Sequence, residues 1–225
     1  MIWSAFGQTL PQAVGIAISP IPMVLVILML VSARARTNGP AFAIGWTVGV
    51  VGVAGIAYAL SNGADMATDP DASDAGSAVQ VLLGLLFLFL AARAWRHRPG
   101  PGDEPSTPKL FSAVDTMSAL KCLGLGFAAA AANPKNLPLA ISAGVSIAQA
   151  GATGGSGVAA VLLFGIAAST TVLVPVIGVL VLGDRTREPL DALKVWLLAN
   201  NSTIMMVLFI VLGAKMLGSG LALTS

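Results

Sequence analysis

Ser19-Pro20-Ile21-Pro22 lies inside a hydrophobic segment in the first half of this chain, and Asn133-Pro134-Lys135-Asn136-Leu137-Pro138 lies inside one in the second half. Proline lacks the N–H that a helix interior needs, so each stretch is expected to break a helix. A bilayer offers no water to satisfy the backbone groups that a break frees, so such backbone survives only where protein or a polar cavity surrounds it. The two stretches therefore predict two broken membrane helices and an enclosed site.

The composition indicates an integral membrane protein. Of its 225 residues, 56% are hydrophobic and 10% are charged, which is too little polar surface for a soluble globule of this size. Cys122 is the single cysteine, so neither a disulfide within the chain nor a dithiol redox relay is expected. A net charge of +2 argues against nucleic acid binding, and the lone histidine, His97, does not indicate a metal site. We expect no cofactor and no enzymatic activity.

The predicted fold is an all-α bundle of six membrane helices, because a span needs about 20 mostly apolar residues. The expected spans cover residues 11–32, 41–60, 78–95, 123–149, 157–183 and 195–217. The proline-rich, polar segment 96–110 is expected to be a cytoplasmic linker. It would join a first three-helix repeat at 1–95 to a second at 111–225.

The basic residues predict the orientation of these spans. Ten of the 12 Lys and Arg residues fall in the first, third and fifth connections or beside them, whereas the second connection carries only acids and the fourth no charge. Cytoplasmic loops are enriched in Lys and Arg, so these three connections are placed inside and both termini outside. The expected location is the bacterial inner membrane.

The two halves are expected to form an inverted repeat. Each half has a broken span, a glycine-rich span and a compact apolar span, and three spans per half require opposite orientations. In the glycine-rich spans, Gly45 and Gly49 are four residues apart, as are Gly165 and Ser169. That spacing of small residues lets two helix backbones approach closely, so these four positions are predicted to pack helices together.

Lys135 is the charged residue predicted to lie deepest in a span. A charged side chain at mid-membrane costs about 2.5 to 3.5 kcal/mol on insertion scales, so such residues usually face a pathway. Lys135 would attract an anion or carry a proton; alternatively, it only caps carbonyl groups freed by Pro134 and Pro138. The residues predicted to bind substrate or gate its passage are Ser19, Pro20, Pro22, Asn133, Pro134, Lys135, Asn136 and Pro138.

The two proline-containing signatures, SPIPMVLVILML and NPKNLPLAISAG, resemble those of the LysE-type exporter superfamily. Its six-span members carry a Pro-x-Pro element early and Asn-Pro-Lys at the start of the second repeat. Amino-acid exporters of that superfamily usually carry Pro-Gly-Pro, where this chain has Pro20-Ile21-Pro22. The chain looks closest to the actinobacterial peptidoglycolipid-addressing (GAP) family, also called sulfolipid-addressing proteins.

This resemblance implies an exporter that helps a glycolipid or other polar lipid across the inner membrane, beside membrane lipids and a larger lipid pump. Two alternatives stay open: a small-solute exporter for amino acids or metal cations, and a non-transporting accessory subunit of a lipid pump. No nucleotide-binding motif occurs, so an ion gradient or a partner would supply the energy. Whether the chain forms a homo-oligomer is left open by the sequence.

Overall fold

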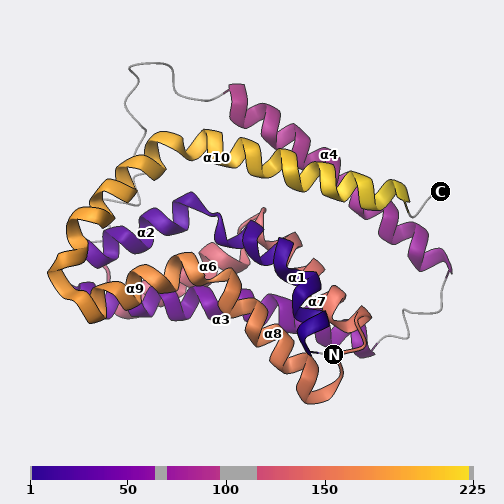
Figure 1. Cartoon of the computed structure of the whole chain (residues 1–225), viewed down its shortest axis with the longest axis horizontal. Helices are drawn as coiled ribbons and strands as arrows, with labels where there is room; N and C mark the ends of the chain where they lie inside the picture. Colours follow the sequence, from indigo (N-terminus) through magenta and orange to yellow (C-terminus); the bar gives the residue numbers. More distant parts are fainter. Residues whose placement is uncertain (1, 64–69, 97–115, 223–225) are drawn as a thin grey trace. The chain divides into compact units, whose positions relative to one another are not determined.

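The computed structural model describes residues 2–63, 70–96 and 116–222, and these residues are helical almost throughout (Figure 1). The predicted linker 96–110 lies outside the described residues, apart from Arg96 at the end of a helix. The helices are α1 (Ile2–Ala17), α2 (Pro20–Val31), α3 (Ala35–Gly63), α4 (Pro70–Arg96), α6 (Ala119–Ala131), α7 (Asn136–Gln149), α8 (Gly154–Ala168), α9 (Thr170–Leu182), the short 3₁₀ helix η2 (Gly183–Thr186) and α10 (Arg187–Ala222).

The helices form two compact units, which we describe separately. The first contains residues 1–64 and 106–198, and the second contains residues 65–105 and 199–225. In the first unit, α3 packs against α6, α7 and α8, while α1 packs against α7 and α8. Every residue of the candidate site discussed below lies in this first unit.

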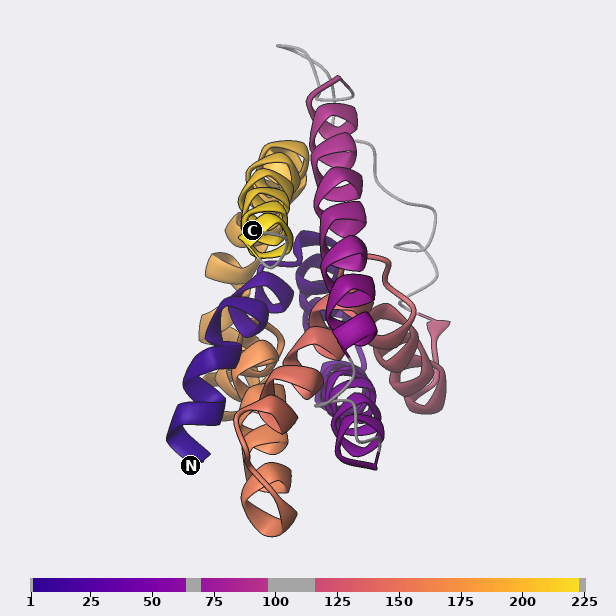
Figure 2. The same cartoon turned by 90° about the vertical axis from the view of Figure 1, so that its right-hand side faces the viewer.

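The second unit pairs α4 with the C-terminal part of α10, and the two run side by side (Figure 2). The Phe87 and Phe209 rings stack with centroids 5.7 Å apart. A Cβ added at Gly84 would press on Leu217, and one added at Gly213 would press on Leu88. From Gly84 to Phe87 along α4, the contacted residue on α10 changes from Leu217 to Phe209, so the two helices are antiparallel.

The first and fourth predicted spans are broken near the predicted positions. α1 and α2 meet at a bend of 64° around Ile18 and Ser19, and four residues separate α6 from α7. The fifth predicted span, 157–183, which Ser169, Thr170, Thr171 and Pro175 make locally polar and kinkable, is also broken. Its two helices, α8 and α9, meet at 69° around Ser169. Ser169 caps both helices there, with its N–H donating to the Gly165 carbonyl.

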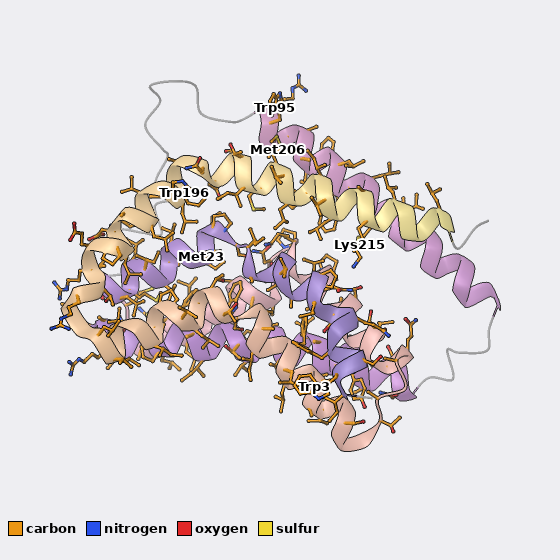
Figure 3. The ribbon with its side chains drawn as sticks, in the orientation of Figure 1. Trp3, Met23, Trp95, Trp196, Met206 and Lys215 are labelled. Carbon is orange, nitrogen blue, oxygen red and sulfur yellow. The ribbon has the colours of Figure 1, made fainter. Side chains whose placement is uncertain are left out.

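The described residues contain between two and four candidate membrane spans. α3 and α10 are each long and apolar enough to cross alone, and the bent pairs α1/α2 and α8/α9 each qualify as one broken span. Their outer faces carry large apolar side chains that water would not favour, such as Ile44, Ile56 and Val181 at 56%, 64% and 74% exposure. Trp3, at the start of α1, is also exposed (Figure 3). The chain is therefore a multi-helix integral membrane protein; six spans, the inverted repeat and the outside termini stay predictions.

Close contacts between backbones hold α3 against α6 and α7. A Cβ added at Gly45 would overlap the Leu123 carbonyl of α6, and one added at Gly49 would lie 2.8 Å from the Ala130 Cβ. In the other direction, a Cβ added at Gly126 of α6 would overlap the Phe42 carbonyl of α3. Helices this close leave no room between them for side chains.

In the other predicted packing pair, Gly165 and Ser169, the two residues have different surroundings. A Cβ at Gly165 would overlap the Val51 side chain of α3, so this glycine lies at a helix contact. Ser169 sits in the break between α8 and α9 and is fully buried.

Candidate functional site

The prolines of the first break leave specific carbonyl groups without a helical partner. In an α-helix each carbonyl accepts from the N–H four residues later. The partners of Ile16 and Ile18 would be Pro20 and Pro22, which have no N–H. The partner of Gly15 would be Ser19, whose N–H instead donates to Ala17 at 2.8 Å. The C-terminal end of α1 therefore presents carbonyl acceptors that other groups must satisfy.

Lys135 satisfies two of these acceptors. Its Nζ donates to the carbonyl oxygens of Gly15 at 2.8 Å and Ile18 at 2.7 Å, and to Ser19 Oγ at 2.7 Å. All three hydrogens of the ammonium are thus used, and the residue is 3% exposed. We call the group formed by Gly15, Ile18, Ser19, Lys135 and Asn136 the Lys135 junction.

Ser19 connects the two breaks. Its hydroxyl accepts from Lys135 and donates to the Ile16 carbonyl at 2.7 Å, the acceptor orphaned by Pro20. The same hydroxyl lies 3.5 Å from Asn136 Oδ1 at the first residue of α7. Ser19 and Asn136 are both buried, at 3% and 0% exposure. The predicted residues of the first and second stretches therefore meet in space.

The remaining predicted residues shape the breaks. Pro20 is the first residue of α2 and Pro22 its third, and Pro138 is the third residue of α7. The first turn of a helix has N–H groups without internal partners, so proline is tolerated there. Asn133 Oδ1 accepts from the backbone N–H of Lys135 at 3.0 Å, which fixes the turn that contains Pro134.

Backbone dipoles favour the Lys135 charge at this place. Lys135 precedes the positive N-terminal end of α7, where a cation is disfavoured, but its side chain reaches the negative C-terminal end of α1. Among the described residues, no carboxylate forms an ion pair with Lys135. The charge is therefore held by carbonyl and hydroxyl dipoles. Lys135 thus caps carbonyl groups of the first break and not those that Pro134 and Pro138 free in its own break.

The break between α8 and α9 also reaches the end of α1, and this contact is not predicted by the sequence. Thr171 Oγ1 donates to the Ala17 carbonyl at 2.7 Å, so α9 contacts the same group of acceptors. Ser169 Oγ and Asn136 Nδ2 are buried without a hydrogen-bond partner. The sequence signal here is the polar run Ser169-Thr170-Thr171, which with Pro175 makes the fifth span locally polar and kinkable but does not indicate the partner of Thr171.

Two cavities in the described part of the first unit bear on its function. One, of about 420 Å³ beside α3 and α7, is apolar, with Ser61 as its single polar lining residue among Val53, Ile56, Ala57, Leu60, Leu137, Ile141 and Val145. The other, of about 450 Å³, is lined by arginines and is treated below. Within the described ranges, no cluster of three or more His, Cys, Asp or Glu residues could hold a metal ion.

Residues 9–222 match the family model described as Sap, sulfolipid-1-addressing protein. The chain belongs to the sulfolipid-1-addressing protein family. The match covers nearly the whole chain and confirms the family predicted from the two proline-containing signatures. It is a membrane lipid-addressing family, and its description implies a role in sulfolipid or glycolipid handling. Neither the curated proteins nor the solved structures contain a match to this chain.

Proposed function

We propose that this protein is a secondary-type transporter that assists a glycolipid or other polar lipid across the inner membrane. The observation that carries the proposal is the Lys135 junction, in which a buried ammonium group joins two helix breaks from distant parts of the chain. Irregular backbone and a buried charge at membrane depth are both costly, and both usually mark a transport pathway.

The junction supports a mechanism of alternating access. Each broken helix can change direction at its break without losing further backbone hydrogen bonds, because the prolines have already removed them. The three donated bonds of Lys135 then hold the α1/α2 and α6/α7 breaks together in the observed arrangement. Substrate or a coupling ion that competes for these acceptors would release the breaks and let the half-helices move.

A lipid substrate is supported by the apolar cavity beside α3 and α7. Its volume of about 420 Å³ and its nearly uniform apolar lining suit an acyl chain better than an amino acid or a metal cation. The family description points in the same direction. We therefore favour the polar-lipid exporter over the small-solute exporter.

The test is a lipid-translocation assay in vesicles that contain the full chain. A fluorescent short-chain sulfated glycolipid is incorporated, and its transfer between leaflets is followed by dithionite quenching. Lys135→Met retains side-chain length but removes the charge, so translocation is expected to fall to the rate of protein-free vesicles. Lys121→Met is the matched control, because Lys121 is an exposed lysine on α6, and its rate is expected to equal that of the original protein.

The alternatives give different results. A non-transporting accessory subunit would move no glycolipid in either form, whereas a small-solute exporter would move an amino acid or cation and leave the glycolipid in place. Full translocation by a correctly inserted Lys135→Met protein would refute the proposed role of the junction.

A further inference from the structure

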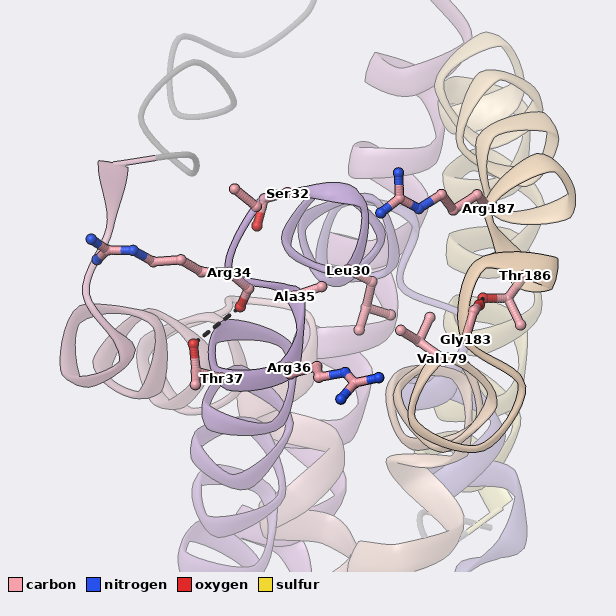
Figure 4. Close-up of a pocket in the computed structure, with 11 residues that line it drawn as sticks. Leu30, Ser32, Arg34, Ala35, Arg36, Thr37, Val179, Gly183, Thr186 and Arg187 are labelled. Atoms are coloured by element: carbon pink, nitrogen blue, oxygen red, sulfur yellow. Dashed lines mark hydrogen bonds between the residues drawn. The ribbon is translucent and has the colours of Figure 1, made fainter.

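An arginine-lined cavity lies at the end of the first unit where the chain passes from α2 to α3 and from α9 to α10. Its volume is about 450 Å³. Arg34 and Arg36 line it from the start of α3, and Arg187 lines it from the start of α10. In Figure 4, Arg36 and Arg187 extend into the space between these elements from opposite sides, whereas Arg34 extends away from it.

The electrostatics of this cavity favour an anion. No acidic residue occurs among its described lining residues, and Arg34 and Arg36 form no ion pair within the described part of the chain. The cavity also adjoins the N-terminal ends of two long helices, α3 and α10, whose dipoles present partial positive charge. Guanidinium groups bind planar and tetrahedral oxyanions through paired N–H donors.

Membrane topology alone does not account for this arrangement. The positive-inside rule places arginines in these connections, but it requires only that they lie on the cytoplasmic side. Here Arg36 and Arg187, which are 151 positions apart in the sequence, border one cavity. Arg185 provides the comparison, because it is exposed in the same connection and is not among the lining residues.

We propose that this cavity, which we call the arginine pocket, binds the sulfate or phosphate ester headgroup of an anionic lipid. Arg36 and Arg187 would hold the oxyanion from opposite sides while the acyl chains stay in the bilayer. The inference deepens the proposed function, because it names the headgroup chemistry and the membrane face where the lipid is first bound. It rests on that function for the biological role of the site. Binding itself is measurable without transport.

The experiment measures lipid retention by the full chain in phosphatidylcholine nanodiscs. A minor fraction of phosphatidic acid or of a sulfated glycolipid is included, and bound lipid is quantified by native mass spectrometry. Arg36→Gln and Arg187→Gln are each expected to weaken retention of both anionic lipids about tenfold, which corresponds to about 1.4 kcal/mol. Arg185→Gln removes the same charge from the same connection and is expected to leave retention unchanged.

A competition arm identifies the source of the oxyanion. Inorganic sulfate or inorganic phosphate is added to the same samples. A site for a lipid headgroup is expected to keep its lipid while the free anion is dilute, whereas a site for soluble anions would release the lipid. Displacement by dilute free anion, or an equal loss with Arg185→Gln, would overturn the proposal. Lys135→Met separates the two proposals: it is expected to retain lipid while losing translocation, and its loss of lipid retention would place the binding site at the junction instead.

Discussion

Replacing Ser19 by alanine tests whether the Lys135 junction is held together by hydrogen bonds. The Ser19 hydroxyl is the one group that both accepts from Lys135 and donates to the Ile16 carbonyl. Ser19→Ala removes both bonds without adding bulk. It leaves the ammonium with two acceptors and returns the Ile16 carbonyl to the unpaired state that Pro20 imposes.

The expected loss of stability follows from these two bonds. A hydrogen bond to a charged group contributes about 1.5 to 3 kcal/mol, and a buried carbonyl left unpaired costs about 1 to 3 kcal/mol. The variant should therefore lose about 2.5 to 6 kcal/mol of unfolding free energy. Ser156→Ala is the control, because Ser156 makes the same type of bond to a carbonyl three residues earlier, at 2.8 Å, but at an exposed position. An exposed substitution of this kind changes stability by about 0.5 kcal/mol or less.

The assay is reversible unfolding in detergent, followed by circular dichroism as a denaturing detergent is added. Lys135→Met and the double variant with Ser19→Ala complete a double-mutant cycle. Residues in one hydrogen-bonded network give a coupling energy of about 0.5 to 3 kcal/mol. Strictly additive losses, or a Ser19→Ala loss no larger than that of Ser156→Ala, would refute the junction as described.

Two further predictions concern helix packing and the breaks. Gly126→Ala should destabilise the protein by about 1 to 3 kcal/mol, because its Cβ would overlap the backbone of α3. Gly124→Ala is the control: a Cβ there meets nothing within 4 Å, so it should stabilise α6 by up to about 1 kcal/mol. Equal unfolding free energies of the two variants would contradict the close contact. Pro22→Ala and Pro138→Ala each restore an N–H that favours a straighter helix by about 0.5 to 1.5 kcal/mol, so lipid translocation should slow about two- to tenfold. Unchanged rates in both variants would count against a role of these prolines in movement.

The sequence predicted the helical class and the positions of two breaks because both depend on local chemistry. Hydrophobic length indicates a membrane helix, and proline removes backbone hydrogen bonds wherever the chain folds. Those properties predicted breaks in the stretches 19–22 and 133–138, and in the structure α2 begins at Pro20 and α7 at Asn136. The same proline signatures indicated the family.

The partners of Lys135 could not be predicted, because they depend on how distant helices pack. The sequence shows that carbonyl groups are orphaned at two breaks, but not which break the Lys135 side chain reaches. The polar run at Ser169 and Pro175 indicate that the fifth span can kink, but for a related reason they do not fix the place of the bend. Pro175 lies six residues beyond it, inside α9, and α9 continues through this proline. The arginine pocket likewise arises where two connections that are remote in sequence come together.

The Lys135 junction is held by hydrogen bonds, whereas the rest of the buried core of the first unit is mainly apolar, and this difference bears on movement. Packed apolar side chains lose their contacts when helices shift by a small distance, so they hold one arrangement strongly. Donor–acceptor pairs can be exchanged for water or for a ligand, at a net cost of about 0.5 to 1.5 kcal/mol for each typical bond. The breaks supply the acceptors, and Lys135 and Thr171 supply donors from α7 and α9. A leucine at position 135 would fill the space but could not be exchanged in this way, so we expect it to insert, fold and fail to transport.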